Sequence, residues 1–198
     1  MNAIAGLILA AGESSRIGRD KALLCYRGRT FIENLITTLQ EASIGRIVVV
    51  LGYHAEEIGQ RISGANAELV VNQDYRRGQT SSLQAGLRVL REHEPDGVVM
   101  CLVDHPAISA DTVRQLIYHF KSSGKLVVIP EFHGQHGHPV VVGQELFGKF
   151  LALSPDEGAD TVIHRYRDQT RFVEVSDPGV SLDVDDPEAY RQLTVRGG

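Results

Sequence analysis

The feature that most constrains the fold is a series of short apolar runs in which valine, isoleucine and leucine follow one another with little alternation. Such a run is typical of a strand that is covered on both faces, because side chains on both sides of the strand are then buried. We expect strands at Ile4 to Ala10, Arg46 to Leu51, Glu68 to Val71, Gly97 to Val103, Leu126 to Pro130, His138 to Val142 and Arg171 to Val175.

Helix signals lie between the apolar runs. A capping side chain or the capping-box spacing predicts a helix N-terminus, and such signals stand at Thr30 with Glu33, at Ser81 with Gln84, at Ser109, and at Asp186 before Pro187. Gly45 is expected to close the helix that follows Thr30. Strands that alternate with helices predict a three-layer α/β/α, Rossmann-like fold with a mostly parallel central sheet. Ligands of such a sheet bind at the carboxyl ends of its strands.

Length and composition fit a single domain over residues 1–198. With 42% apolar residues, 23% charged residues and a net charge of −5, the chain is ordinary for a globular protein, and no block of like charges indicates a nucleic-acid or membrane partner. The N-terminus lacks the basic region of a secretory signal. Cys25 and Cys101 lie far apart without metal-ligand spacing and are expected to be reduced packing thiols. These features predict a cytoplasmic protein.

The loop after the first strand gathers groups that can bind a polyphosphate. Ala10, Ala11 and Gly12 let the backbone come close to a ligand, and Arg16 and Lys21 bring fixed positive charge to the same loop. Backbone amides combined with cations form anion sites of this kind. The spacing matches neither a P-loop nor a dinucleotide fingerprint. A polar turn without a ligand is therefore the alternative interpretation.

Two acidic sites occur later in the chain. Asp104 follows an apolar strand, where a carboxylate facing the crevice suits Mg²⁺; a cap on the turn at Pro106 is the alternative. Asp183, Asp185 and Asp186 precede the last helix. By themselves, three acids at that place are typical of a solvated helix cap.

The first loop resembles the signature of a known family. Its pattern is Leu9-Ala10-Ala11-Gly12-x-Ser14-x-Arg16-x-Gly18-x-x-Lys21. This pattern is similar to that of the nucleotidyltransferases that mature the molybdenum cofactor, the molybdopterin cytidylyltransferases and guanylyltransferases of the MobA-like NTP transferase family. The guanylyl branch typically has a second glycine where this chain has Ala11, so the resemblance favours CTP.

The resemblance implies roles for both acidic sites. Residues 182–188 are similar to the family's terminal Asp-x-Asp-Thr-Pro-Glu segment, whose second acid is Asp185 here. In the family this acid completes a Mg²⁺ site with the mid-chain aspartate, which corresponds to Asp104. Asp186 is then expected to cap the last helix. The expected catalytic residues are Arg16, Lys21, Asp104 and Asp185.

The segment after the third expected strand resembles the family's nucleotide loop, which surrounds the base and the sugar. An ordinary capped helix start would explain Ser81, but it would not explain Gly78 and Thr80. The resemblance therefore implies nucleotide contacts from Asn72, Gly78, Thr80, Ser81 and Ser82, in addition to Leu9, Ala10, Ala11, Gly12, Arg16 and Lys21.

Two further segments resemble the acceptor side of the family. His138 matches a family histidine, whereas His136 and Asp160 stand where the relatives carry arginine. Both departures remove positive charge from the expected acceptor side. His133, His136 and His138 also form a histidine-rich tract, which we interpret as part of a loop rather than as a transition-metal site.

The predicted function is transfer of CMP from CTP to a phosphorylated acceptor, which the resemblance identifies as molybdopterin, with Mg²⁺ as cofactor and a molybdoenzyme as client. One alternative changes the acceptor to a sugar phosphate or a polyol phosphate. Another is a non-catalytic accessory protein that hands a nucleotide or cofactor to a client enzyme. A nicotinamide oxidoreductase is disfavoured because the sequence lacks the dinucleotide fingerprint.

Overall fold

The computed structural model describes residues 3–14, 17–154 and 156–196. Its central strands are β1 (Ile4–Ala10), β4 (Ile47–Leu51), β5 (Glu68–Val71), β6 (Gly97–Leu102), β7 (Val127–Phe132), β8 (Gln135–His136), β9 (Val140–Gly143) and β10 (Thr170–Glu174). They form one sheet in the order β10-β7-β9-β6-β1-β4-β5, with β8 paired to β7. A separate hairpin joins β2 (Cys25–Tyr26) to β3 (Arg29–Thr30).

All seven expected strands form, and their ends differ from the expected ones by no more than two residues. Every residue of β1 and of β4 is buried, which is the reason for their continuous apolar sequences. β1 pairs in parallel with both β4 and β6. β9 runs antiparallel to β6 and β7, so the sheet is mostly parallel, as predicted.

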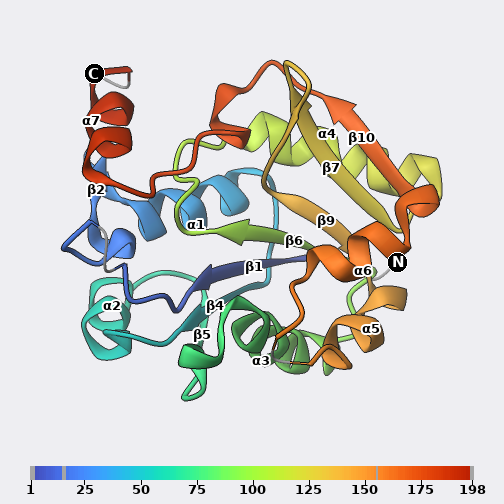
Figure 1. Cartoon of the computed structure of the whole chain (residues 1–198), viewed down its shortest axis with the longest axis horizontal. Helices are drawn as coiled ribbons and strands as arrows, with labels where there is room; N and C mark the ends of the chain where they lie inside the picture. The colour runs from blue at the N-terminus through green and yellow to red at the C-terminus, as the bar shows by residue number, and fades with distance from the viewer. Residues whose placement is uncertain (1–2, 15–16, 155, 197–198) are drawn as a thin grey trace.

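Helices cover both faces of the sheet. They are α1 (Phe31–Glu41), α2 (Ala55–Arg61), α3 (Gln79–Arg91), α4 (Ala110–Ser123), α5 (Phe147–Leu151), α6 (Asp160–Arg165) and α7 (Pro187–Arg196). Ile8 packs with residues of α1 and α4, whereas its neighbours Leu7 and Leu9 pack with α3 and α5 on the opposite face. Figure 1 shows α1 and α4 on one side of the sheet and α3 and α5 on the other. The three-layer α/β/α prediction is confirmed.

Three of the four predicted helix caps are present. Thr30 and Glu33 form a complete capping box, Ser109 Oγ accepts a hydrogen bond from the Thr112 amide, and Asp186 Oδ1 accepts one from the Ala189 amide. Two of the predicted helix ends were wrong.

The helix that follows Thr30 ends at Glu41 rather than near Gly45, because Ser43 adopts a left-handed backbone with φ 66°. α3 begins at Gln79 with Gly78 as its N-cap, so Ser81 lies inside the first turn. There its hydroxyl donates to the Gly78 carbonyl instead of capping an amide.

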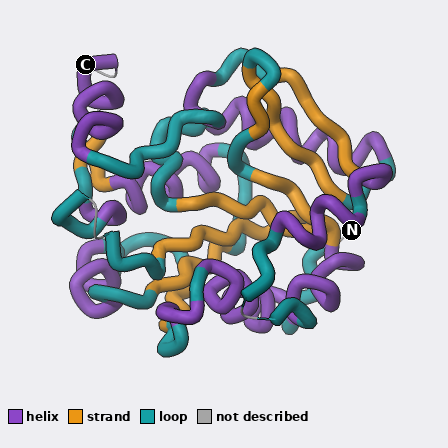
Figure 2. Tube along the Cα trace, in the orientation of Figure 1, coloured by secondary structure: helices purple, strands orange, loops and turns teal. Residues whose placement is uncertain are grey.

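The last helix completes the fold beside the β2–β3 hairpin. The Tyr190 hydroxyl of α7 donates to the Cys25 carbonyl at 2.9 Å, and its ring meets Phe31 edge-on. Figure 2 shows the strands crossing the middle of the molecule between the helices. Within the described residues, no helix combines the length and the apolar character that a membrane crossing requires.

Candidate functional site

The loop after β1 is held closed by two side chains that act on the backbone. Ser14 Oγ accepts a hydrogen bond from the Lys21 amide at 3.0 Å. Asp20 Oδ1 accepts one from the Ala22 amide at 2.9 Å, which caps the short 3-10 helix Lys21–Leu23. Both contacts place Lys21 at the carboxyl end of β1. Arg16, the other cation expected here, lies outside the described residues.

Two carboxylates from distant parts of the chain meet at Lys21. The Val184 amide donates to the Asp104 carbonyl at 2.9 Å, which places the segment before α7 beside the end of β6. Lys21 Nζ lies 2.5 Å from Asp185 Oδ1 and 3.5 Å from Asp104 Oδ2. The structure therefore brings together three of the four expected catalytic residues.

A cavity of about 250 Å³, here called the inner cavity, opens beside this cluster. The expected site residues on its wall are Leu9, Ala10, Ala11, Gly12, Lys21, Gly78, Ser82 and Asp104. Gly78 has φ 96°, a backbone conformation that favours glycine, and it turns the chain into the first turn of α3. The inner cavity thus lies at the carboxyl ends of the parallel strands, where ligands of such sheets bind.

Asn72 and Ser81 support the wall of the inner cavity from behind. Asn72 is buried, and its Nδ2 donates to Ser81 Oγ at 2.9 Å and to Ser82 Oγ at 3.0 Å. Its Oδ1 accepts from the Asp74 amide at 3.0 Å. These bonds tie the end of β5 to the first turn of α3. In this structure the two residues shape the loop and are not part of the cavity's described lining.

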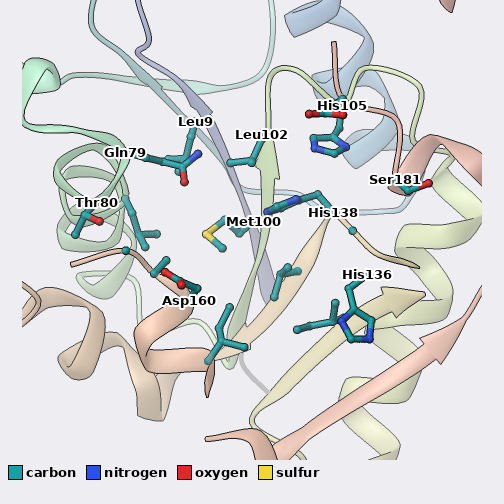
Figure 3. A pocket seen from close by; sticks show the side chains of 18 residues that line it. Leu9, Gln79, Thr80, Met100, Leu102, His105, His136, His138, Asp160 and Ser181 are labelled. Atoms are coloured by element: carbon teal, nitrogen blue, oxygen red, sulfur yellow. The ribbon is translucent and has the colours of Figure 1, made fainter. Parts of the chain in front are cut away.

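A second cavity of about 540 Å³, here called the outer cavity, lies next to the inner one. Leu9, Gln79 and Leu102 border both cavities, so the two are neighbours across one partition. Thr80 and His138, both expected site residues, line the outer cavity. Figure 3 shows Thr80 and Asp160 on one side of it and His138 on the other.

The described lining of the outer cavity carries little positive charge. It contains neither lysine nor arginine, and it includes the carboxylates of Asp160 and Asp183. Burial, together with the smaller effect of nearby His105, lowers the pKa of His138 to about 3. Burial also lowers the pKa of His105, against the opposing effect of the Asp104 charge. The two rings lie 5.0 Å apart and are neutral near pH 7.

Of the remaining histidines of the tract, His136 also lines the outer cavity, whereas His133 is not among its described lining residues. His133 and Gly134, with φ 50° and 78°, form the two-residue turn between β7 and β8, where we expected a loop. His136 stacks on Phe172 and bonds to Glu131 Oε2 at 3.0 Å. Among the described residues, no group of three or more histidine, cysteine, aspartate or glutamate side chains is placed to hold a metal ion.

Sequence reasoning missed several residues of the two cavities. Gln79 borders both cavities and Tyr75 lines the inner one. His105, directly after Asp104, lines the outer cavity. His105 could have been predicted from the sequence, because it directly follows the expected site residue Asp104. Tyr75 was not predictable, because it reaches the site by packing at Gly52, where a Cβ would lie 2.6 Å from Tyr75 Cβ and from the Ala11 carbonyl.

Comparison with known proteins identifies this arrangement. A family model described as the MobA-like NTP transferase domain matches residues 6–170, which include the loop after β1, both cavities' strands and Asp104. The chain belongs to the MobA-like NTP transferase family. Its family is therefore one of nucleotidyltransferases. Both cavities lie at the carboxyl ends of the strands, where ligands of such sheets bind.

Three relatives show the range of this family. The chain is 31% identical to nicotine blue oxidoreductase of Paenarthrobacter nicotinovorans, covering 96% of both chains. It is 28% identical to the molybdenum cofactor cytidylyltransferase of Escherichia coli K12, covering 96% of this chain and 95% of the relative. The crystal structure of Rv0371c from Mycobacterium tuberculosis H37Rv superposes with a TM-score of 0.84 at 26% identity, covering 98% of both chains. Rv0371c has also been solved in complex with manganese.

Proposed function

We propose that this MobA-like NTP transferase moves CMP from CTP onto the phosphate of molybdopterin and releases pyrophosphate. The observation that carries the proposal is the meeting of Lys21 and Asp104, which line the inner cavity, with Asp185. An acid pair with a cation at a strand end suits transfer between phosphates, because that chemistry depends on positioning and charge stabilisation. Similarity to the cytidylyltransferase of E. coli and the presence of Ala11 favour CTP.

The acid pair fits a divalent cation, for which we propose Mg²⁺. Asp104 Oδ1 is buried without a hydrogen-bond partner, and Lys21 already places one positive charge between the two carboxylates. Two carboxylates leave room for water and phosphate oxygens, which is the coordination that Mg²⁺ prefers. Asp104 and Asp185 would hold the ion, and when bound it would neutralise charge on the phosphates. The manganese complex of Rv0371c supports a divalent ion in the family.

In this proposal the two cavities bind different substrates. The amides of the loop after β1 and Lys21 bind the triphosphate in the inner cavity. The acceptor occupies the outer cavity and directs its phosphate across the partition at Leu9, Gln79 and Leu102. An acceptor phosphate oxygen forms a bond to the α-phosphorus while the bond from that phosphorus to the pyrophosphate oxygen breaks. No side chain acts as a nucleophile in this reaction.

Three other functions remain as rivals. A sugar phosphate or polyol phosphate could replace molybdopterin, and the absence of lysine and arginine from the described outer lining favours an acceptor with little negative charge beyond its phosphate. An accessory protein would have no use for the acid pair at Lys21. One relative is named an oxidoreductase, but hydride transfer would leave the same acid pair without a role.

The test compares the binding of CTP, GTP, UTP and ATP in the presence of Mg²⁺ by calorimetry. Wild type should prefer CTP, and Asp104→Ala should lose that binding, whereas the exposed control Asp168→Ala should keep it. Pyrophosphate release with CTP and molybdopterin should fall by about 10²-fold or more in Asp104→Ala. Equal nucleotide binding by wild type and Asp104→Ala would contradict the proposed site. If pyrophosphate is released with a polyol phosphate but not with molybdopterin, the acceptor is a polyol phosphate.

A further inference from the structure

One wall of the outer cavity is built by the segment that connects α5 to α6. Gly158 and Ala159 at the end of this segment, and Asp160 and Ile163 in α6, line the cavity. The described residues between Ala152 and Ala159 form neither helix nor strand. Such a segment keeps its position only through contacts with a neighbouring element. We call the described residues 152–154 and 156–159 the acceptor-side segment.

The neighbour that holds the acceptor-side segment is α3. Gln84 Nε2 lies 2.9 Å from the Leu153 carbonyl, 3.1 Å from the Phe150 carbonyl and 3.4 Å from the Leu151 carbonyl. Thr80 Oγ1 donates to the Glu157 carbonyl at 2.6 Å. Because Thr80 and Gln84 are four residues apart, they lie on the same face of the helix.

The carbonyls that Gln84 contacts need a donor. The last four carbonyls of a helix have no amide partner within that helix, and α5 ends at Leu151. A glutamine side chain offers two N–H donors at the end of a flexible stem. Gln84 therefore stabilises the end of α5 and the start of the acceptor-side segment from outside, and its side chain lines neither cavity in the described structure.

α3 serves both halves of the site. Its first turn carries Gln79, which borders both cavities, and Ser82, which lines the inner one. The second turn of the same helix holds the acceptor-side segment through Gln84. A single helix thus sets the distance between the nucleotide end of the site and the wall against which the acceptor rests.

We propose that Gln84 is a positioning residue for the acceptor, acting through the acceptor-side segment on the wall of the outer cavity. This inference rests on the proposed function for the identity of the acceptor. Loss of the Gln84 amide weakens acceptor binding, because the wall at Ala159 and Asp160 is no longer held at one distance from α3. Nucleotide binding is unaffected, because the inner cavity does not include this segment.

The test uses Gln84→Met, which keeps the length of the side chain and removes its donors. Gln84→Lys restores N–H donors at a similar reach, and Gln60→Met on α2 is the matched control for a glutamine-to-methionine change. At saturating CTP and Mg²⁺, Gln84→Met should raise the KM for molybdopterin about 5- to 10-fold, the size of one lost hydrogen bond. The kcat and the CTP dissociation constant should stay close to wild type, and Gln84→Lys should recover part of the loss.

Hydrogen exchange of the backbone amides in residues 152–160 provides a readout that needs no acceptor. Exchange should accelerate in Gln84→Met and remain at the wild-type rate in Gln60→Met. Unchanged exchange, or a fall in kcat equal to the rise in KM, would overturn the inference. If wild type releases no pyrophosphate with molybdopterin, the proposed function fails, while the exchange result still decides whether Gln84 holds this segment.

Discussion

Lys21 is the central charged residue of the candidate site. Its ammonium lies between two carboxylates, and its side chain is only 12% exposed. Like charges at such short range disfavour each other's ionised state unless a cation is close by. Lys21 supplies that cation, and a metal ion held by the two carboxylates would compete with it for the same oxygens. In the proposed function Lys21 would therefore link the acid pair to the triphosphate, the other group of high negative charge.

Lys21→Met tests this link at the residue scale. We predict that the variant binds Mn²⁺ more tightly than wild type in the absence of nucleotide, because the carboxylates lose their internal cation. We also predict that pyrophosphate release falls by about 10²-fold, because the triphosphate loses a stabilising charge. Titration of Mn²⁺ by electron paramagnetic resonance measures the first effect. Lys149→Met on the exposed face of α5 is the control, and equal Mn²⁺ affinities in wild type and Lys21→Met would contradict the prediction.

The buried imidazole of His138 gives the protein a dependence on acid pH. Its pKa of about 3 in the folded state lies below the ordinary value of 6.5, so the unfolded state takes up a proton first as the pH falls. Stability is therefore lost as the pH falls below about 6.5, and the loss ends near pH 3. At pH 5 we expect a loss of about 2 kcal/mol.

Urea unfolding of wild type and His138→Gln between pH 7.5 and pH 4.5 measures this effect. The variant should show a flatter pH dependence, whatever its absolute stability at pH 7.5. His164→Gln, which changes an exposed histidine of α6, should retain the wild-type slope. Parallel slopes for wild type and His138→Gln would show that another group causes the acid sensitivity.

At the scale of elements, the sequence predicts a strand well where its residue pattern has a single structural cause. β1, β4 and β6 were predictable because burial on both faces demands an apolar run. β8, the β2–β3 hairpin and the antiparallel direction of β9 were not predicted. These depend on turns, such as His133–Gly134, whose left-handed backbone is not specific to that residue pair.

The candidate site was predictable to a similar extent. The resemblance led to Lys21, Asp104, Asp185 and His138, and the structure brings the first three together. That Lys21 bonds directly to Asp185 could not be foreseen, because it depends on the Val184–Asp104 backbone bond between segments far apart in the chain. The double role of Gln79 depends in the same way on how α3 packs.

Gly137 lies in the β8–β9 connection, where the backbone packs closely against another part of the chain. A Cβ at this position would collide with the Val180 carbonyl, and the next amide, His138, donates to that same carbonyl at 2.9 Å. We predict that Gly137→Ala lowers the free energy of unfolding by about 1–3 kcal/mol, because backbone must move to admit the methyl group. Gly148→Ala in α5 meets no atom within 4 Å and should leave stability equal or higher. Urea unfolding of the two variants decides the point.

At the scale of the whole molecule, one sheet serves both the core and the site. The two large hydrophobic clusters share the sheet as their common wall, since alternate residues of β1 belong to opposite clusters. The inner and outer cavities meet at Leu9 of β1 and Leu102 of β6, in the middle of the sheet. Neither half of the site can therefore unfold without exposing part of the core that the other half uses.

This shared core predicts that residues 1–198 unfold as one cooperative domain. Calorimetry should give a single transition with equal calorimetric and van't Hoff enthalpies. CTP with Mg²⁺ at about 100 times its dissociation constant should stabilise wild type by about 2.7 kcal/mol, which raises the Tm by roughly 5–10 °C. Asp104→Ala should unfold in a single transition as well but show no shift with the nucleotide. Two transitions would show that the two sides of the sheet unfold separately. If the nucleotide then raised the Tm of only one transition, it would bind to that half of the molecule alone.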